Sequence, residues 1–409
     1  MLESAKVIII SVLIARYYGP ENFGKFSFII SIVSIVSIVA EFRIQNVLTK
    51  DFSKKNHDAG LLLGSAMSVN MFFSFIGFMI VGVFSLFEND DVVKMCLLIY
   101  ATSFFFKIPR SYRAYFIAHE KNRIIAVCEI YSSILSLLLL GYCISISVDL
   151  YILVISRTSD FLIFGLFIYM FFSREKFKEE LKYRFDRVTA KKLITLSAPL
   201  VLSGFAMILF QRIDLILVRQ LISDYAAGIY SASLNITLIF SIIPLVISES
   251  IAPKMYRVEK EEESYLSVRH DFIFIVTSVG VLLSVVMFIM GGAVLKILYG
   301  EEYMSGLLTM KILSFCPFLI SLGAAAGQVI VADERQKGVF KKSIIALILT
   351  IISNLLLVPT IGIEGAAIST VLGLLLANFI LHYYIDNYKY LFRMQCLCFK
   401  RLIHMKSGV

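Results

Sequence analysis

Long apolar segments follow one another along this chain, with only short polar loops between them. Examples are residues 61–87, 124–148, 193–210, 272–298 and 344–358. A bilayer core about 30 Å thick is crossed by about 20 apolar residues in a helix. About a dozen segments of this length fit into the chain and leave little of it for a soluble domain. The sequence therefore predicts an all-α integral membrane protein with about twelve transmembrane helices.

Composition agrees with this class, because 58% of the residues are hydrophobic and only 17% are charged. A soluble protein this apolar could not cover its core with polar surface. No cleavable signal peptide is expected, since the first apolar segment, 7–15, ends at Arg16 without a small-residue cleavage pattern. That segment is short for a span, so we expect either a tilted, marginal first helix or a misassigned start. The six cysteines predict packing roles rather than a disulfide framework or a metal site.

The basic residues that give the net charge of +9 are distributed unevenly among the loops. Most lysines and arginines lie at Lys6, in the loops after even-numbered helices and in the C-terminal tail. The loops after odd-numbered helices are short and acidic, as at 88–91 and 301–302. The positive-inside rule then predicts a cytoplasmic location for both termini. We interpret the basic excess as a topology signal, and we expect no nucleic-acid partner.

A weak internal repeat divides the chain. Residues 117–123 (Ile-Ala-His-Glu-Lys-Asn-Arg) agree in character with 331–337 (Val-Ala-Asp-Glu-Arg-Gln-Lys), and 16–27 echo 219–231. The offset corresponds to six helices, so both halves have the same orientation and are expected to form two parallel six-helix bundles around a central cleft. The predicted organisation is an N-terminal bundle (1–173), a cytoplasmic linker (174–192), a C-terminal bundle (193–388) and a cytoplasmic tail (389–409).

Charges at membrane depth are the strongest functional signal. Each costs about 3 kcal/mol on insertion scales, so it normally faces protein or water. Residues 156–160 (Ser-Arg-Thr-Ser-Asp) interrupt an apolar run, and Arg157 and Asp160 are three apart and can pair. The segment is either a buried ion pair that fixes helix register or a wall of an aqueous cleft.

Three further charges lie in or beside apolar runs. Arg212 and Asp214 are two residues apart and point to different sides, so each needs another partner or water. Their alternative role is an interfacial pair near the outer headgroups. Lys311 has no acid three or four residues away, and it either faces the cleft or snorkels to the outer interface.

Other charged side chains lie near the helix ends that we predict to be cytoplasmic. They could form the salt bridges of an inner gate, or they could be ordinary interfacial anchors. The gate candidates are Glu41, Arg110, Glu129 and Glu249, with Arg43 and Arg113 nearby. We found no metalloprotease, serine-hydrolase or phosphate-loop motif, so we do not expect an enzyme.

Three motifs carry a family resemblance. Residues 15–27 (Ala-Arg-Tyr-Tyr-Gly-Pro-Glu-Asn-Phe-Gly-Lys-Phe-Ser) closely resemble the first outer loop of polysaccharide-biosynthesis flippases of the O-antigen or Wzx type. Residues 197–230, with Ser-Ala-Pro, Arg-Ile-Asp and Ala-Gly-Ile-Tyr, and residues 359–370 resemble two further signatures of that family. These flippases belong to the superfamily of the multidrug and toxin exporters, so the resemblance implies a MATE-like fold.

The resemblance also implies a cargo and partners. The cargo would be an undecaprenyl-diphosphate-linked oligosaccharide, moved from the inner to the outer leaflet of the bacterial cytoplasmic membrane for O-antigen of lipopolysaccharide, capsule or a similar polymer. A polysaccharide polymerase and a chain-length regulator are the implied protein partners. We predict that Arg212, Lys311 and Arg157 bind the diphosphate. Asp160 or Asp214 would bind a coupling proton or sodium ion, and no other cofactor is expected.

Two other functions stay open at this point. A cation-coupled exporter of small organic molecules shares the fold class, but its cavity would favour acidic side chains. A membrane glycosyl polymerase would need a larger outer loop.

Overall fold

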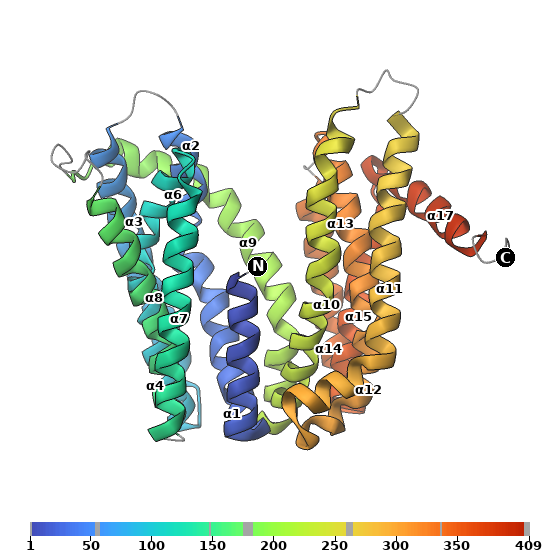
Figure 1. Cartoon of the computed structure of the whole chain (residues 1–409), viewed down its shortest axis with the longest axis horizontal. Coiled ribbons are helices and arrows are strands. Elements are labelled where there is room, and N and C mark those ends of the chain that lie inside the picture. The colour runs from blue at the N-terminus through green and yellow to red at the C-terminus, as the bar shows by residue number, and fades with distance from the viewer. Residues whose placement is uncertain are drawn as a thin grey trace. The chain divides into compact units, whose positions relative to one another are not determined.

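The computed structural model describes residues 2–53, 58–146, 149–174, 183–258, 265–335 and 338–404, and every regular element in these ranges is helical (Figure 1). This confirms the predicted all-α membrane fold. The first group of helices is α1 (Leu2–Glu41), α2 (Ile44–Phe52), α3 (Ala59–Leu86), α4 (Asp91–Ala101), α5 (Ser103–Phe106), η1 (Ile108–Arg110), α6 (Ser111–Ala118), α7 (Asn122–Ile146) and α8 (Leu150–Ser173).

The later helices begin with the 35-residue α9. They are α9 (Arg187–Leu221), α10 (Asp224–Tyr256), α11 (Tyr265–Tyr299), η3 (Glu301–Gly306), α12 (Leu307–Leu313), α13 (Cys316–Ala332), α14 (Val339–Ile361), α15 (Ile363–Leu375), η5 (Leu376–Ile380), α16 (Leu381–Tyr384), η6 (Asp386–Tyr388) and α17 (Lys389–His404). The segment η5 is a π-helix. All six cysteines are free thiols, and only Cys396 is not buried.

Ten helices in the described ranges are long and apolar enough to cross a membrane. An eleventh span is formed if η3–α12 and α13, which meet at a bend of 40°, count as one. The long α1 is two helical segments, because the backbone at Gly19 has φ 72° and ψ 174°. Glycine adopts this positive φ without strain, and Pro20 is well suited to start the second segment. The two segments of α1 correspond to the first two of the predicted helices.

The chain forms two compact units. Unit 1 contains residues 1–18 and 25–212, and unit 2 contains residues 19–24 and 213–409. This division differs from the predicted one, which placed a linker at 174–192 and all of 193–388 in a second bundle. Residues 175–182 of that linker lie outside the described residues, and its end is already the first part of α9.

The reason for the difference lies in the first half of α9. Ala190 and Leu193 are buried in the apolar core of unit 1, together with residues of α2, α3, α6, α7 and α8. In addition, Lys192 forms an ion pair of 2.6 Å with the buried Asp51 of α2. An unbroken helix therefore starts in unit 1 and passes into unit 2 after Arg212.

The predicted cytoplasmic tail is also structured. Residues 389–404 form α17, and Leu391, Met394 and Cys398 are buried in the core of unit 2 with residues of α10, α11 and α13. The apolar residues of α17 recur at helical spacing, so burying them stabilises the helix against the bundle. Residues 405–409 lie outside the described residues.

The internal repeat is visible in the backbone. Glu120 and Glu334, which are equivalent in the 117–123 and 331–337 motifs, have φ 59° and 57°. Each is followed by the same return hydrogen bond, from Lys121 N to Phe116 O at 2.8 Å and from Arg335 N to Ile330 O at 3.0 Å. Both are left-handed helix C-terminal turns. The same turn at equivalent positions supports the predicted repeat.

Candidate functional site

The polar segment of α8 contains the ion pair that its spacing predicts. Arg157 Nη1 lies 3.0 Å from Asp160 Oδ2, and the two side chains are 12% and 6% exposed. The hydroxyls of Thr158 and Ser159 donate to carbonyls of their own helix, at Val154 and Ser156. These bonds satisfy the two hydroxyls within α8. Asp160, which already pairs with Arg157, is left as the group that can take a further partner from another helix.

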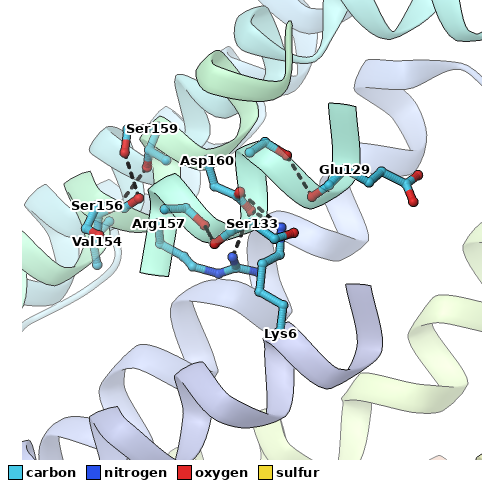
Figure 2. Close-up of polar contacts among 11 residues, drawn as sticks. Lys6, Glu129, Ser133, Val154, Ser156, Arg157, Ser159 and Asp160 are labelled. Carbon is cyan, nitrogen blue, oxygen red and sulfur yellow. Dashed lines mark hydrogen bonds and ion pairs between the residues drawn. The ribbon is translucent and has the colours of Figure 1, made fainter. Parts of the chain in front are cut away.

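Lys6 of α1 supplies that partner (Figure 2). Its Nζ lies 3.0 Å from Asp160 Oδ1 and 2.8 Å from Asp160 Oδ2, and both side chains are buried. One carboxylate therefore holds two cations. The sequence did not identify Lys6 as a site residue, because its position near the N-terminus suggested a topology signal. Its spacing from Asp160 along the chain gives no local clue.

A cavity of about 140 Å³ opens beside this cluster. Water needs roughly 10–15 Å³ of such volume, so the cavity has room for several waters or a small charged group. Three cations and two carboxylates line it, which gives it a formal excess of one positive charge. The lining residues are Lys6, Val7, Arg110, Glu129, Ser132, Arg157, Asp160, Phe161 and Phe164.

Arg110 of η1 faces the cavity beside two aromatic rings. Its Cζ lies 5.3 Å from the ring centre of Phe161 and 5.7 Å from that of Phe164. Lys107 Nζ lies 4.7 Å from the Phe161 ring as well. Rings at these distances stabilise a cation through its attraction to their faces. The aromatic rings of α8 therefore stabilise the positive charge of Arg110, in addition to the ion pairs that Asp160 makes in this cavity.

Three of the four gate candidates belong to unit 1, where Arg110 and Glu129 line the same cavity and Glu41 lies near Arg110. Glu41 pairs with Lys107 at 2.8 Å, and Glu129 pairs with Arg113 at 3.1 Å. The Glu129 side chain points away from Asp160 in Figure 2. Glu249, the fourth candidate, is exposed on α10 and belongs to unit 2. A role of these residues in a gate remains a prediction.

The side chains of Arg212 and Asp214 lie in different surroundings, as their two-residue spacing predicts. Arg212 belongs to unit 1, where it is half-buried and has an electrostatic interaction with the buried Tyr100. Tyr100 also lies near Arg157 and Asp160, so Arg212 is close to the same polar region. Asp214 belongs to unit 2 and has different partners.

Asp214 is buried among neutral polar groups from three other helices. Asn354 Nδ2 on α14 donates to Asp214 Oδ1 at 2.6 Å, and Thr370 Oγ1 on α15 donates to Asp214 Oδ2 at 2.5 Å. The Tyr230 hydroxyl on α10 lies 3.4 Å from Oδ2 and 2.9 Å from Thr370 Oγ1. The sequence identified only the carboxylate, because a single amide or hydroxyl in an apolar span has no distinctive spacing.

This second cluster has the composition of a small-cation site. Asp214 has no ion pair in the described part of the chain, and Asn354 Oδ1 is buried without a hydrogen-bond partner there. Carboxylate, amide and hydroxyl oxygens are the ligands that hard cations prefer. A buried carboxylate without a cation is costly, and a proton or a metal cation would neutralise it.

Lys311 belongs to unit 2. It is exposed on α12, and its Nζ lies 5.8 Å from the ring centre of Phe288. It is not among the residues that line the 140 Å³ cavity. Its contact with substrate remains a prediction.

Three comparisons relate this chain to known proteins. The family model described as polysaccharide biosynthesis protein matches residues 7–259. The capsular polysaccharide biosynthesis protein CapF of Staphylococcus aureus is 24% identical over 391 residues, which are 94% of this chain and 96% of CapF.

Solved structures share the fold. The lipid II flippase MurJ, in an inward closed conformation, matches with a TM-score of 0.74 at 16% identity, over 99% of this chain and 91% of MurJ. An inward-facing MATE family multidrug transporter of the MOP superfamily matches with a TM-score of 0.65 at 13% identity, over 100% and 95% of the two chains. Both matches confirm the MATE-like fold. Since the family model covers more than half of its length, this multi-pass membrane protein belongs to the polysaccharide biosynthesis protein family.

Proposed function

We propose that this protein is a flippase for an oligosaccharide linked to a lipid through a diphosphate. It would move its cargo from the inner to the outer leaflet of the bacterial cytoplasmic membrane by alternating access, with both termini in the cytoplasm. The observation that carries the proposal is the cavity of unit 1, where Lys6, Arg110 and Arg157 outnumber two carboxylates. Family membership and the MurJ-like fold support a lipid-linked cargo.

The geometry suggests how the site would change on binding. Asp160 holds Lys6 and Arg157 together at 2.8 and 3.0 Å. A diphosphate offers several charged oxygens, and arginine and lysine bind such oxygens by strong charge-assisted hydrogen bonds. Asp160 would therefore keep the two cations in place until the headgroup arrives, and Arg212 would add a further positive charge. Lys311, which is exposed on α12, is proposed as a further contact for the headgroup.

Of the two acids predicted to couple an ion, Asp214 is the better candidate. Asp160 is already neutralised by two cations, whereas Asp214 is surrounded by neutral donors. A proton or a sodium ion at Asp214 would remove the cost of a buried, unpaired charge. Thr370 and Asn354 would hold the carboxylate in position for it.

Charge reversal tests the proposal. Arg157→Glu and Arg212→Glu would be expressed in a strain that lacks the transporter, with Lys296→Glu, an exposed residue on α11, as the matched control. We expect lipid-linked oligosaccharide to accumulate in the inner leaflet and surface polysaccharide to be lost in the first two strains only. Undiminished surface polysaccharide at equal protein level would refute the role of both arginines.

The alternatives make different predictions. An exporter of organic cations would change drug susceptibility when deleted, and a cavity with excess positive charge does not favour it. A glycosyl polymerase would alter polymer length without accumulating an inner-leaflet intermediate. The similarity to CapF favours a capsule-type polymer over O-antigen. Contact with a polymerase and a chain-length regulator is part of the proposal and would be tested by crosslinking in cells.

A further inference from the structure

The C-terminal helix α17 is held in one rotational position by a buried polar chain. Gln395 is fully buried; its Oε1 lies 3.1 Å from His382 Nδ1, and its Nε2 donates to Asn378 O of η5 at 3.0 Å. Lys342 Nζ of α14 lies 3.3 Å from His382 Nε2. The hydrogen bonds of Gln395 come in addition to the apolar contacts of α17. They specify which face of the helix points toward unit 2.

Contacts at its two ends place α17 across one end of unit 2. Near its start, the Tyr390 hydroxyl donates to Asp333 Oδ2 at 2.7 Å, just after the end of α13. Near its end, Arg401 Nη1 lies 2.5 Å from Asp271 Oδ1, in the second turn of α11. Figure 1 shows α17 extending outward from α11 and α13. Because only residues 385–388 separate it from the last spanning segment, α17 lies at the boundary between membrane and water.

The face of α17 that points away from unit 2 is basic. Lys389, Arg393 and Lys400 are exposed, and at 100° per residue they lie within about 40° of one another around the helix. Lys389 pairs with Asp386, whereas Arg393 and Lys400 have no ion pair in the described part of the chain. Leu397 lies beside this basic stripe and is 50% exposed. The helix therefore offers cations and an apolar side chain to the same surroundings.

We propose that the basic stripe of Lys389, Arg393 and Lys400 binds anionic phospholipid headgroups of the bilayer around unit 2. A helix with one apolar and one basic face is typical of the membrane interface, and anionic lipids attract its cations. Tyr383 and Tyr384, which precede α17, are 53% and 73% exposed, and tyrosines are enriched at this depth. A bound lipid headgroup would supply the counter-charge for Arg393 and Lys400. This inference is independent of the cargo.

Lipid binding by the intact chain tests the proposal. Native mass spectrometry of the purified protein would be used to titrate phosphatidylglycerol and, separately, phosphatidylcholine. The double variant Arg393→Gln/Lys400→Gln changes exposed residues, so the fold is expected to persist. Each cation near an anionic surface strengthens binding about fivefold, so we expect phosphatidylglycerol affinity to fall about 5- to 25-fold, with phosphatidylcholine binding unchanged.

The control is Lys94→Gln/Lys296→Gln, which removes the same charge from α4 and α11. Unchanged phosphatidylglycerol affinity in the α17 variant, or an equal loss in the control, would overturn the proposal. A shift in oligomeric mass without a change in bound lipid would overturn it as well, since it would identify a second copy as the occupant.

A depth measurement gives an independent answer. A spin label at Leu397→Cys, with Cys396→Ser to avoid double labelling, would be measured in vesicles of phosphatidylcholine and phosphatidylglycerol. We expect the label to be more accessible to oxygen, which partitions into lipid, than to a water-soluble nickel complex. The opposite ranking would show that the stripe faces water, and it would contradict the proposal.

Discussion

Gly24 and Gly228 are equivalent in the two sequence repeats, and each packs against the backbone of the segment that contains the other. A Cβ atom on Gly24 would lie 1.8 Å from Asp224 O, and one on Gly228 would lie 1.9 Å from Pro20 O. Real Cβ atoms are not found this close to backbone oxygens, so only glycine fits either position. The contact joins the start of the second segment of α1 to the start of α10 within unit 2.

Alanine at either glycine is expected to destabilise the protein. Gly24→Ala and Gly228→Ala force backbone apart, and overpacking of this kind costs about 1–3 kcal/mol or more. Gly82→Ala and Gly141→Ala are matched controls, since nothing lies within 4 Å of their added Cβ atoms, and they should be neutral or gain up to about 1 kcal/mol. Thermal unfolding in detergent measures all four. Equal stability of the two pairs would show that the contact is not tight.

The Lys6–Asp160–Arg157 cluster should behave as one unit. Asp160→Asn leaves two buried cations without a counter-charge and is expected to cost about 3–5 kcal/mol of unfolding free energy. Adding Lys6→Met removes one of those cations, so the double variant should be more stable than Asp160→Asn alone. A double-mutant cycle measures the coupling. Additive effects of the two substitutions would contradict the shared role of Asp160.

Asp214 should be required for ion coupling rather than for the fold. Asp214→Asn keeps the shape of the side chain but removes the charge, and we expect export to fall at least about tenfold, or 1.4 kcal/mol in the barrier. Asp91→Asn, at an exposed carboxylate of α4 with no assigned role in transport, is the control and should export normally. The measurement is surface polysaccharide at equal protein level, with and without a sodium gradient or a proton gradient. Normal, gradient-dependent export by Asp214→Asn would exclude this residue.

The two repeat-equivalent turns allow a stabilising substitution. Glu120 and Glu334 have positive φ, which costs an L-residue roughly 1–2 kcal/mol. Glycine removes this strain but is more flexible in the unfolded chain, so Glu120→Gly and Glu334→Gly should each gain about 0.5–1 kcal/mol. Glu249→Gly within right-handed α10 should instead lose about 1 kcal/mol. Thermal unfolding distinguishes the signs, and a loss at either turn would show that the glutamate makes a compensating contact.

Asp333, just beyond the end of α13, predicts a pH dependence. Burial alone would raise the pKa of Asp333, but hydrogen bonds from Tyr390 at 2.7 Å and Tyr265 at 2.8 Å and the Arg269 guanidinium at 3.0 Å lower this pKa below its ordinary value. A carboxyl with a lowered pKa in the folded protein contributes stability at neutral pH. This contribution is lost as the pH falls from about 4 through the folded-state pKa.

We therefore expect Asp333→Asn to be less stable than the wild type at pH 7 and to approach it at pH 3. Unfolding temperatures measured between these values test the prediction. Glu249→Gln should follow the wild-type curve, because Glu249 is exposed and has no ion pair in the described residues. A constant gap between Asp333→Asn and the wild type across this range would contradict the sign of the pKa shift.

The sequence by itself determined the membrane class, the spanning segments and one ion pair. Each of these depends on residues that are close along the chain. Hydropathy over about 20 residues specifies a span, and three-residue spacing on one helix brings Arg157 to Asp160. The family motifs are also made of residues that are close along the chain. One contains the turn at Gly19, and another contains the start of α10.

Only the tertiary structure decided which of these local features meet. Lys6 and Asp160 are 154 residues apart, and Asp214 is 140 and 156 residues from Asn354 and Thr370. The helix pattern specifies where a residue lies along its own helix, but it does not specify which neighbouring helix the side chain contacts. In a membrane, where every helix is apolar on most faces, that choice depends on packing and buried polar contacts. The same reason explains why α9 divides between the two units and why the predicted tail is a docked helix.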